Sequence, residues 1–166
     1  VTSLSVEIVV VDDASQDTSV EVAKAEGADC VVELEQNVGV TGAKNYGAVR
    51  AGNEWLIFLD SDDMLTPDAF QEMESILDNH DDIDILFGAC RTMDGRNLAT
   101  QSCTFGFHSY SKMLQSENPG EFLPICNRRI FDDIKYVVNL RGFEGATWLE
   151  AAKKGRKLFY SDRVIR

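Results

Sequence analysis

The first ninety residues alternate short apolar runs with segments of helical spacing, and this alternation restricts the possible folds more than any other feature. The apolar runs are residues 7–11, 30–33, 55–59 and 84–90, and the helical segments between them are residues 15–26, 40–51 and 66–79. Strands joined through helices lie parallel, because the crossover helix returns the chain to the same end of the sheet. The pattern predicts an α/β fold with a Rossmann-type, mostly parallel sheet and helices on both faces. Within it, we expect Thr66 to cap the third helix and Pro67 to be its first residue.

Residues 91–166 are less regular. Apolar runs predict strands at 98–105, 122–127 and 158–160, and helical spacing predicts helices at 109–115, 129–134 and 146–154. A chain of 166 residues is long enough for one domain with its own core, and no linker or repeat divides it. We therefore expect a single domain, residues 1–166, with a regular half at 1–90 and an irregular half at 91–166.

The two halves differ in charge. Residues 1–90 hold 20 Asp and Glu against 3 Lys and Arg, whereas residues 91–166 hold 8 against 13. The acidic half argues against nucleic-acid binding, which requires a basic footprint, and suits a protein that binds cations or cation-bridged anions. No apolar run approaches the roughly 20 residues of a membrane span, and the first residues do not resemble a signal peptide. With four widely spaced cysteines, the sequence predicts a cytoplasmic protein with reduced thiols.

Acidic residues directly follow two of the predicted strands. Asp12 and Asp13 come after the first apolar run, and Asp60, Asp62 and Asp63 come after the third. The carboxyl ends of parallel strands meet at the edge of the sheet where α/β proteins bind ligands, so we expect these carboxylates to converge. Converging carboxylates repel one another unless a cation balances them, and their oxygens suit a hard divalent ion. The alternative is a solvated acidic turn.

A glycine-rich segment lies between the two acidic clusters. Gly39, Gly42 and Gly47 open and line the second predicted helix, and Lys44 within it is one of only 3 basic residues in the first 90. Small residues let a ligand approach the backbone, and the start of a helix favours an anion. Lys44 therefore indicates a phosphate or a specific acidic partner. The alternative is that the glycines only allow the helix to pack tightly on the sheet.

Three motifs occur in order along this half of the chain. They are residues 11–18 (Val-Asp-Asp-Ala-Ser-Gln-Asp-Thr), Asn37 and Gly39 with residues 43–47 (Ala-Lys-Asn-Tyr-Gly), and residues 58–63 (Phe-Leu-Asp-Ser-Asp-Asp). Together they resemble the family 2 glycosyltransferases, which are nucleotide-sugar-dependent enzymes of the GT-A fold. The resemblance implies that residues 1–90 bind the nucleotide and that residues 91–166 meet the acceptor. It implies a metal-dependent, inverting transfer of a sugar from a nucleotide-diphosphate sugar, a UDP-sugar above all, to a glycan, lipid-linked or other hydroxyl acceptor.

The resemblance also implies roles for single residues. The nucleotide site would comprise Asp12, Asp13, Ser15, Gly39, Lys44 and Asp60. Within it, Asp12 or Asp13 would hydrogen-bond the base, and Asp60 would lie near the ribose. The metal, Mn²⁺ or Mg²⁺, would be held by Asp60 and Asp62 where it bridges the diphosphate.

Glu144 is the residue that matches the family's catalytic base. An inverting transfer needs a group that takes the proton of the acceptor hydroxyl. When Trp148 and Gly155 are aligned with the family pattern, Glu144 stands at the catalytic aspartate, and Phe143 replaces the glutamate before it. The alternative is that Glu144 is an acid at the start of a helix, favoured by the helix dipole.

The chain departs from the family at its start, where members carry an additional strand and helix. Without that strand, the strand predicted at 7–11 would keep an unpaired edge, which favours association with another chain. One rival function is therefore an incomplete transferase domain that binds a nucleotide or a partner without turnover. Another is a phosphoacceptor receiver domain that uses Asp12, Asp13 and Asp60, with Lys112 downstream. Basic runs such as residues 153–157 leave peripheral contact with a membrane or an anionic acceptor open.

Overall fold

The computed structural model describes residues 4–115, 119–138 and 142–166. The chain forms two compact units that interleave along the sequence. The small-sheet unit contains Ser5–Leu56 and Arg128–Trp148, and the large-sheet unit contains Ile57–Asn127 and Leu149–Arg166. Leu4 also belongs to the large-sheet unit, and the chain passes between the units after Leu4, within β3 (Trp55–Ile57), after Asn127 and within α5 (Gly145–Lys153). The expectation of one domain with halves 1–90 and 91–166 stays a prediction.

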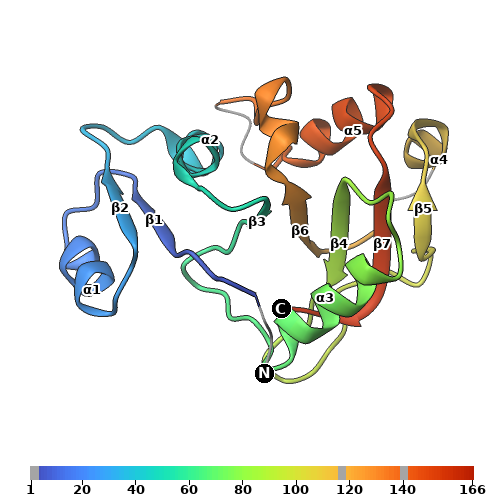
Figure 1. The fold of residues 1–166 in the computed structure, drawn as a ribbon, viewed down its shortest axis with the longest axis horizontal. Coiled ribbons are helices and arrows are strands. Elements are labelled where there is room, and N and C mark those ends of the chain that lie inside the picture. The colour runs from blue at the N-terminus through green and yellow to red at the C-terminus, as the bar shows by residue number, and fades with distance from the viewer. Residues whose placement is uncertain (1–3, 116–118, 139–141) are drawn as a thin grey trace. The chain divides into compact units, whose positions relative to one another are not determined.

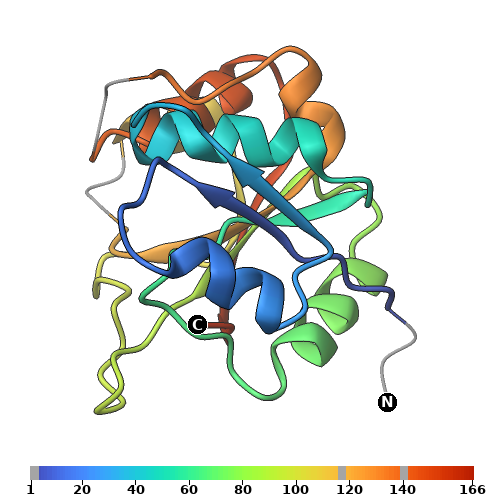
Figure 2. The same ribbon diagram turned by 90° about the vertical axis from the view of Figure 1, so that its left-hand side faces the viewer.

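The small-sheet unit is built on two parallel strands, β1 (Val9–Asp12) and β2 (Cys30–Glu33), which pair along their whole length. α1 (Ser19–Ala25) makes the crossover between them, and α2 (Gly39–Arg50) follows β2. The two helices lie on different sides of the strand pair (Figure 2). Among the described residues β1 pairs with β2 alone.

Asn45 fastens α2 to the later part of the small-sheet unit. Its Nδ2 donates a hydrogen bond to the Tyr136 carbonyl at 2.8 Å, and its Oδ1 accepts one from the Tyr136 N–H at 2.9 Å. One amide side chain thereby satisfies both backbone groups of Tyr136, as a neighbouring strand would. The Tyr136 ring is buried against Phe131 of the 3₁₀ helix η1 (Arg128–Asp132) and against Trp148. This arrangement makes Asn45 and Trp148 part of the packing of the unit.

The large-sheet unit contains a mixed sheet with strands in the order β6, β4, β7 and β5 (Figure 1). These strands span Phe122–Asn127, Ile85–Ala89, Leu158–Val164 and Gly106–His108. β4 pairs in parallel with β7 and antiparallel with β6, and β5 pairs antiparallel with β7. Every residue of β4 is buried, so β4 is the centre of this core. The unit also contains α3 (Ala69–Asp78) and α4 (Tyr110–Gln115).

The strands predicted at 30–33 and 122–127 have the predicted ends, and most other predicted elements occur with shifted ends. Two expectations are wrong. No strand forms at 98–105, because the chain turns there, with the Cys103 N–H donating to the Thr100 carbonyl at 3.1 Å. Thr66 does not cap α3: the helix begins at Ala69, and the Thr66 hydroxyl donates instead to the Val164 carbonyl at 3.2 Å. The last strand is also longer than expected, since β7 continues beyond residue 160.

His108 on β5 is buried and gives the stability of the protein a dependence on pH. Its Nε2 lies 2.7 Å from the Thr104 carbonyl oxygen, its ring centroid lies 4.4 Å from that of Tyr160, and only 6% of the residue is exposed. Burial lowers the pKa of His108 below its ordinary value of 6.5. The unfolded chain, whose histidine titrates at the ordinary value, therefore binds more protons as the pH falls below 6.5.

We expect the free energy of unfolding to fall from pH 7 to pH 5 more steeply in the wild type than in His108→Gln. The reason is that acid favours the unfolded state, in which the imidazole is readily protonated. Urea titrations at several pH values measure how the free energy of unfolding changes with pH in the wild type and in His108→Gln. His80→Gln, at the other of the 2 histidines, is the matched control for the loss of one imidazole. Equal slopes for the wild type and His108→Gln would contradict the prediction.

Candidate functional site

An acidic turn follows β3. The Asp63 N–H donates a hydrogen bond to the Asp60 carbonyl at 3.0 Å, which closes residues 60–63 into a tight turn. Asp60, Ser61 and Asp62 are exposed, whereas Asp63 is half-buried. The Asp62 carboxylate makes no hydrogen bond or ion pair with any residue in the described part of the chain. The turn therefore presents the Asp62 carboxylate to solvent.

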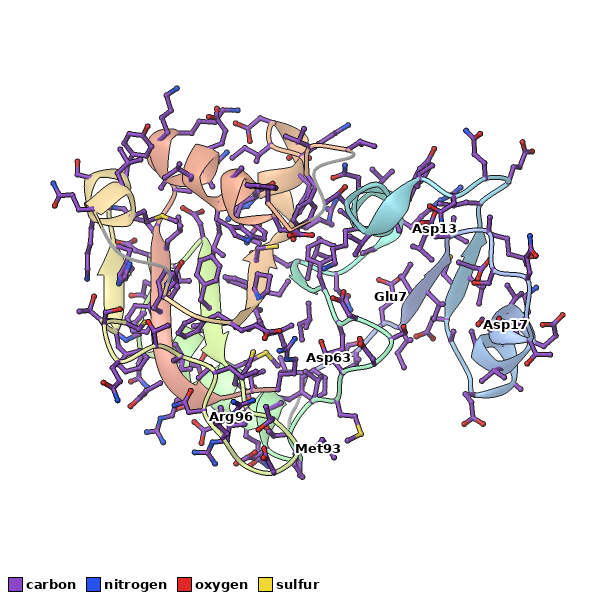
Figure 3. All side chains as sticks on the ribbon, turned by 180° about the vertical axis from the view of Figure 1, so that it is seen from behind. Glu7, Asp13, Asp17, Asp63, Met93 and Arg96 are labelled. Carbon is purple, nitrogen blue, oxygen red and sulfur yellow. The ribbon has the colours of Figure 1, made fainter. Side chains whose placement is uncertain are left out.

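Arg166 holds the buried end of this turn. Its Nη1 lies 2.6 Å from Oδ2 of Asp63, and its Nη2 pairs with Glu121. Figure 3 shows Asp63 on the loop that follows β3. Arg166 is not among the residues predicted from the sequence, because 103 positions separate it from Asp63 and no local motif links the two.

Asp12 and Ser15 form a second turn at the end of β1. The Asp12 carboxylate, in a residue that is only 8% exposed, accepts a hydrogen bond from the Ser15 N–H at 3.1 Å. Between them Ala14 has φ = 61°, in the left-handed region that residues with a side chain rarely adopt. The structure thus brings these two predicted nucleotide-binding residues together in a strained turn.

Asp13 occupies the start of α2. Its carboxylate accepts hydrogen bonds from the N–H groups of Val38 at 2.6 Å and Gly39 at 2.8 Å, and the Asn37 side chain donates to its carbonyl at 3.1 Å. Gly39 has φ = 77°, which is the conformation that glycine adopts without strain. The sequence predicts a ligand anion at this helix start. In the structure a protein carboxylate binds these N–H groups, and the role of Gly39 toward a nucleotide stays a prediction.

Lys44 lies on α2, the helix whose start Asp13 binds. It is half-buried, and it lies one residue before Asn45, the residue that fastens α2 to Tyr136. Five of the predicted nucleotide-binding residues therefore lie in the small-sheet unit: Asp12, Asp13 and Ser15 at or just after the end of β1, Gly39 at the start of α2, and Lys44 in the middle of α2. Asp60 and Asp62 belong to the large-sheet unit.

Glu144 immediately precedes α5. Its carbonyl accepts a hydrogen bond from the Thr147 N–H at 3.0 Å, and its Oε1 lies 3.4 Å from the Gly142 nitrogen, which donates to it. The residue is half-buried, so its carboxylate retains access to solvent. This position at a helix start suits a structural acid, and it is compatible with a general base. Trp148, four residues on, is buried in the core and does not form a surface.

The carboxylates of the acidic turn form at most a partial metal site by themselves. In the described ranges no group of three or more His, Cys, Asp or Glu side chains is arranged to hold a metal ion. Asp60 and Asp62 nevertheless supply exposed carboxylate oxygens at a spacing of two residues, and such donors suit a hard cation with open coordination positions.

A hollow of about 660 Å³ lies beside the turn, within the large-sheet unit. The hollow is lined by residues from three parts of the chain: the segment after the acidic turn, the loop after β4, and the end of β7. They include Met64, Thr66, Arg91, Met93 and Val164. Met93 and Arg96 lie on the loop after β4 in Figure 3. Because β4 and β7 are parallel, their carboxyl ends lie at the same edge of the sheet, which is where α/β folds bind ligands.

The comparisons with known proteins agree with one another. The family model described as glycosyl transferase family 2 matches residues 2–134. The succinoglycan biosynthesis protein ExoO of Rhizobium meliloti is 33% identical over 144 residues, which cover 78% of this chain and 41% of ExoO. The GalNAc(5)-diNAcBac-PP-undecaprenol beta-1,3-glucosyltransferase of Campylobacter jejuni is 28% identical over 171 residues, which cover 96% of this chain and 54% of that enzyme. The chain thus spans about half the length, or less, of these relatives.

The fold has counterparts among solved structures. The crystal structure of S. aureus TarS residues 1–349 superposes with a TM-score of 0.75 at 22% identity, covering 96% of this chain and 50% of TarS. Its complex with UDP gives a TM-score of 0.74. This likeness confirms the α/β class and the GT-A-like fold expected from the sequence. Among the described residues, no helix has both the length and the apolar character that crossing a membrane requires.

Proposed function

The chain belongs to glycosyl transferase family 2, and on this premise we propose that it carries the donor-binding part of a glycosyltransferase. The reaction moves a sugar from a nucleotide-diphosphate sugar, with UDP as the carrier, to a hydroxyl group of a glycan or lipid-linked acceptor. The observation that carries the proposal is the acidic turn: Asp60 and Asp62 are exposed directly after β3, inside the matched region. The TarS complex with UDP supports the choice of nucleotide. Family membership leaves the receiver-domain reading, with Asp60 as phosphoacceptor, without support.

Within the small-sheet unit, the nucleotide is proposed to contact the end of β1 and the helix α2. Asp12 is held by the Ser15 N–H and offers its remaining lone pairs to the base. Asp13 is already engaged by two N–H groups at the start of α2, so Asp12 is the better candidate for the base contact. Lys44 supplies a positive charge on α2 for the phosphates.

Mn²⁺ or Mg²⁺ is proposed to be held by Asp60 and Asp62 together with the diphosphate oxygens. The exposed oxygen donors of the turn fit such an ion, and the nucleotide would complete its coordination. A bound ion would supply Lewis-acid stabilisation of the leaving diphosphate. The contribution proposed for the chain is to orient the two carboxylates through the closed turn at residues 60–63.

The transfer is proposed to be a single displacement that inverts the anomeric carbon. As the acceptor oxygen bonds to that carbon, its proton passes to the Glu144 carboxylate, and the bond from the carbon to the nucleoside diphosphate breaks. The half-buried carboxylate before α5 suits this role because it retains access to solvent.

Replacing Glu144 by glutamine is expected to reduce sugar transfer by roughly 10²- to 10⁴-fold and to leave UDP binding unchanged, because the amide cannot take the acceptor proton. Transfer is measured as release of UDP from UDP-sugars in the presence of acceptor, and binding is measured by calorimetry. Glu150→Gln, on the exposed side of α5, is the matched control. A full rate in Glu144→Gln would contradict the base assignment.

The second candidate function is a domain that binds nucleotide without turnover. The observation that favours it is the position of Glu144, whose carbonyl and carboxylate both take part in starting α5. Calorimetry with UDP and GDP, each with and without Mn²⁺, separates the candidates. Metal-dependent binding with sugar transfer supports the transferase, and the same binding without hydrolysis or transfer of any UDP-sugar supports the binding domain. Failure of both nucleotides to bind in a metal-dependent manner would contradict both.

A further inference from the structure

The backbone of Arg166 and of the residue before it is held by hydrogen bonds to neighbouring segments. Its carbonyl accepts a hydrogen bond from the Arg91 N–H at 2.8 Å. The preceding residue, Ile165, donates to the Ala89 carbonyl and accepts from the Thr66 N–H, each at 2.9 Å. Ile165 is also fully buried. These bonds fix the backbone from which the Arg166 side chain projects.

The Arg166 guanidinium lies between two carboxylates. Its side chain is only 13% exposed, whereas those of Asp63 and Glu121 are 22% and 56% exposed. The Nη1 contact to Asp63 is 2.6 Å, a short charge-assisted hydrogen bond. A partly buried ion pair of this kind restricts the geometry of both side chains, since breaking it leaves a partly buried charge without compensation.

The ion pair with Arg166 holds Asp63, the residue that closes the acidic turn. The Asp63 N–H closes the turn by donating to the Asp60 carbonyl, so the position of Asp63 sets the conformation of the two residues between them. The pairing with Arg166 also neutralises one of the three carboxylates of the turn. The two exposed carboxylates of the turn, Asp60 and Asp62, lie outside this ion pair.

We infer that Arg166 is a positioning residue for donor binding, which acts through Asp63 to hold Asp60 and Asp62 in the geometry that a divalent cation and a nucleoside diphosphate require. The inference rests on the proposed function, and it adds a residue that no motif of the sequence marks. Arg166 does not contact the reacting atoms in this role, and its effect passes through the turn. Outer partners of this kind typically change metal affinity by about 10- to 100-fold.

Calorimetry of the full chain with UDP, at fixed Mn²⁺ and without metal, tests the inference. We expect Arg166→Gln to weaken Mn²⁺-dependent UDP binding by about 10- to 100-fold. The affinity for UDP without metal should not change. General damage to the fold would instead weaken UDP binding both with and without metal. Arg166→Lys, which retains the charge but not the two-pronged geometry, should recover part of the loss. Lys157→Gln removes one positive charge from the exposed residue before β7 and is expected to bind like the wild type.

A double-variant cycle tests the route through Asp63. If Arg166 acts through Asp63, then Asp63→Asn should weaken metal-dependent binding to a similar extent, and the double variant should be no weaker than either single one. Should Arg166→Gln fail to fold, Arg166→Lys and Asp63→Asn provide the same comparison. Wild-type affinity in both of these folded variants would overturn the inference. Absence of metal-dependent UDP binding by the wild type would instead overturn the proposed function.

Discussion

Asp62→Ala is expected to abolish metal-dependent UDP binding and to reduce sugar transfer by roughly a hundredfold or more. Asp62 follows β3 in a closed turn, is exposed, and makes no hydrogen bond or ion pair with the described residues. Its removal therefore leaves the protein core intact and takes away one of the two proposed cation ligands. Calorimetry with UDP and Mn²⁺ measures the binding, and release of UDP from UDP-sugars measures the transfer.

The matched control for Asp62→Ala is Asp81→Ala. Asp81 is also an exposed acid of the large-sheet unit, and it lies outside the acidic turn. The two variants lose the same charge, so a difference between them reports the position of the carboxylate and not the net charge. Thermal unfolding should be the same for both. Metal-dependent UDP binding by Asp62→Ala with wild-type affinity would exclude Asp62 as a ligand.

Gly88→Ala is expected to lower the free energy of unfolding by about 2–3 kcal/mol, the largest stability change we predict. Gly88 lies on the fully buried strand β4. A methyl group on Gly88 would lie 2.4 Å from Cγ1 and 2.9 Å from Cβ of Ile165. Ile165 is itself fully buried and hydrogen-bonded through its backbone, so it has little room to yield. Urea unfolding of the full chain measures the change.

Two further variants make the Gly88 result interpretable. Gly47→Ala, within α2, is the matched control, because the added methyl group would lie at an ordinary contact distance of 3.5 Å from Cγ2 of Val11. Alanine in place of glycine should stabilise this helix by about 0.5–1 kcal/mol. Combining Gly88→Ala with Ile165→Ala should cost less than the sum of the two single changes, since the shortened side chain removes the closest contact. Additive costs would show that the clash with Ile165 is not the cause.

The local part of the fold could be predicted from the sequence. The runs at 30–33 and 122–127 form strands with the predicted ends, because β-branched and apolar residues there are bounded by polar ones. The acidic turn could also be located, since it directly follows a buried strand. The strand expected at 98–105 does not form, because the polar residues 100–102 interrupt the apolar run and favour a turn.

The remote part of the site could not be predicted. Asp63 meets Arg166 across 103 positions, and Asn45 meets the backbone of Tyr136 across 91. Hydrophobic periodicity describes which face of an element is buried, but it does not state which polar groups meet when distant elements pack. The antiparallel pairing of β4 with β6 is hidden for the same reason, because strand direction depends on connections that the irregular second half does not reveal.

The carboxylate of Asp13 at the start of α2 has a thermodynamic consequence for donor binding. Under the proposed function, a diphosphate that approached this helix start would meet N–H groups that are already satisfied and a negative charge beside them. The charge of the diphosphate would then be balanced chiefly by the bound cation. Cation and nucleotide become linked ligands, each raising the affinity for the other by the same factor. The protein would then select the metal–nucleotide complex over the free nucleotide at any given metal concentration.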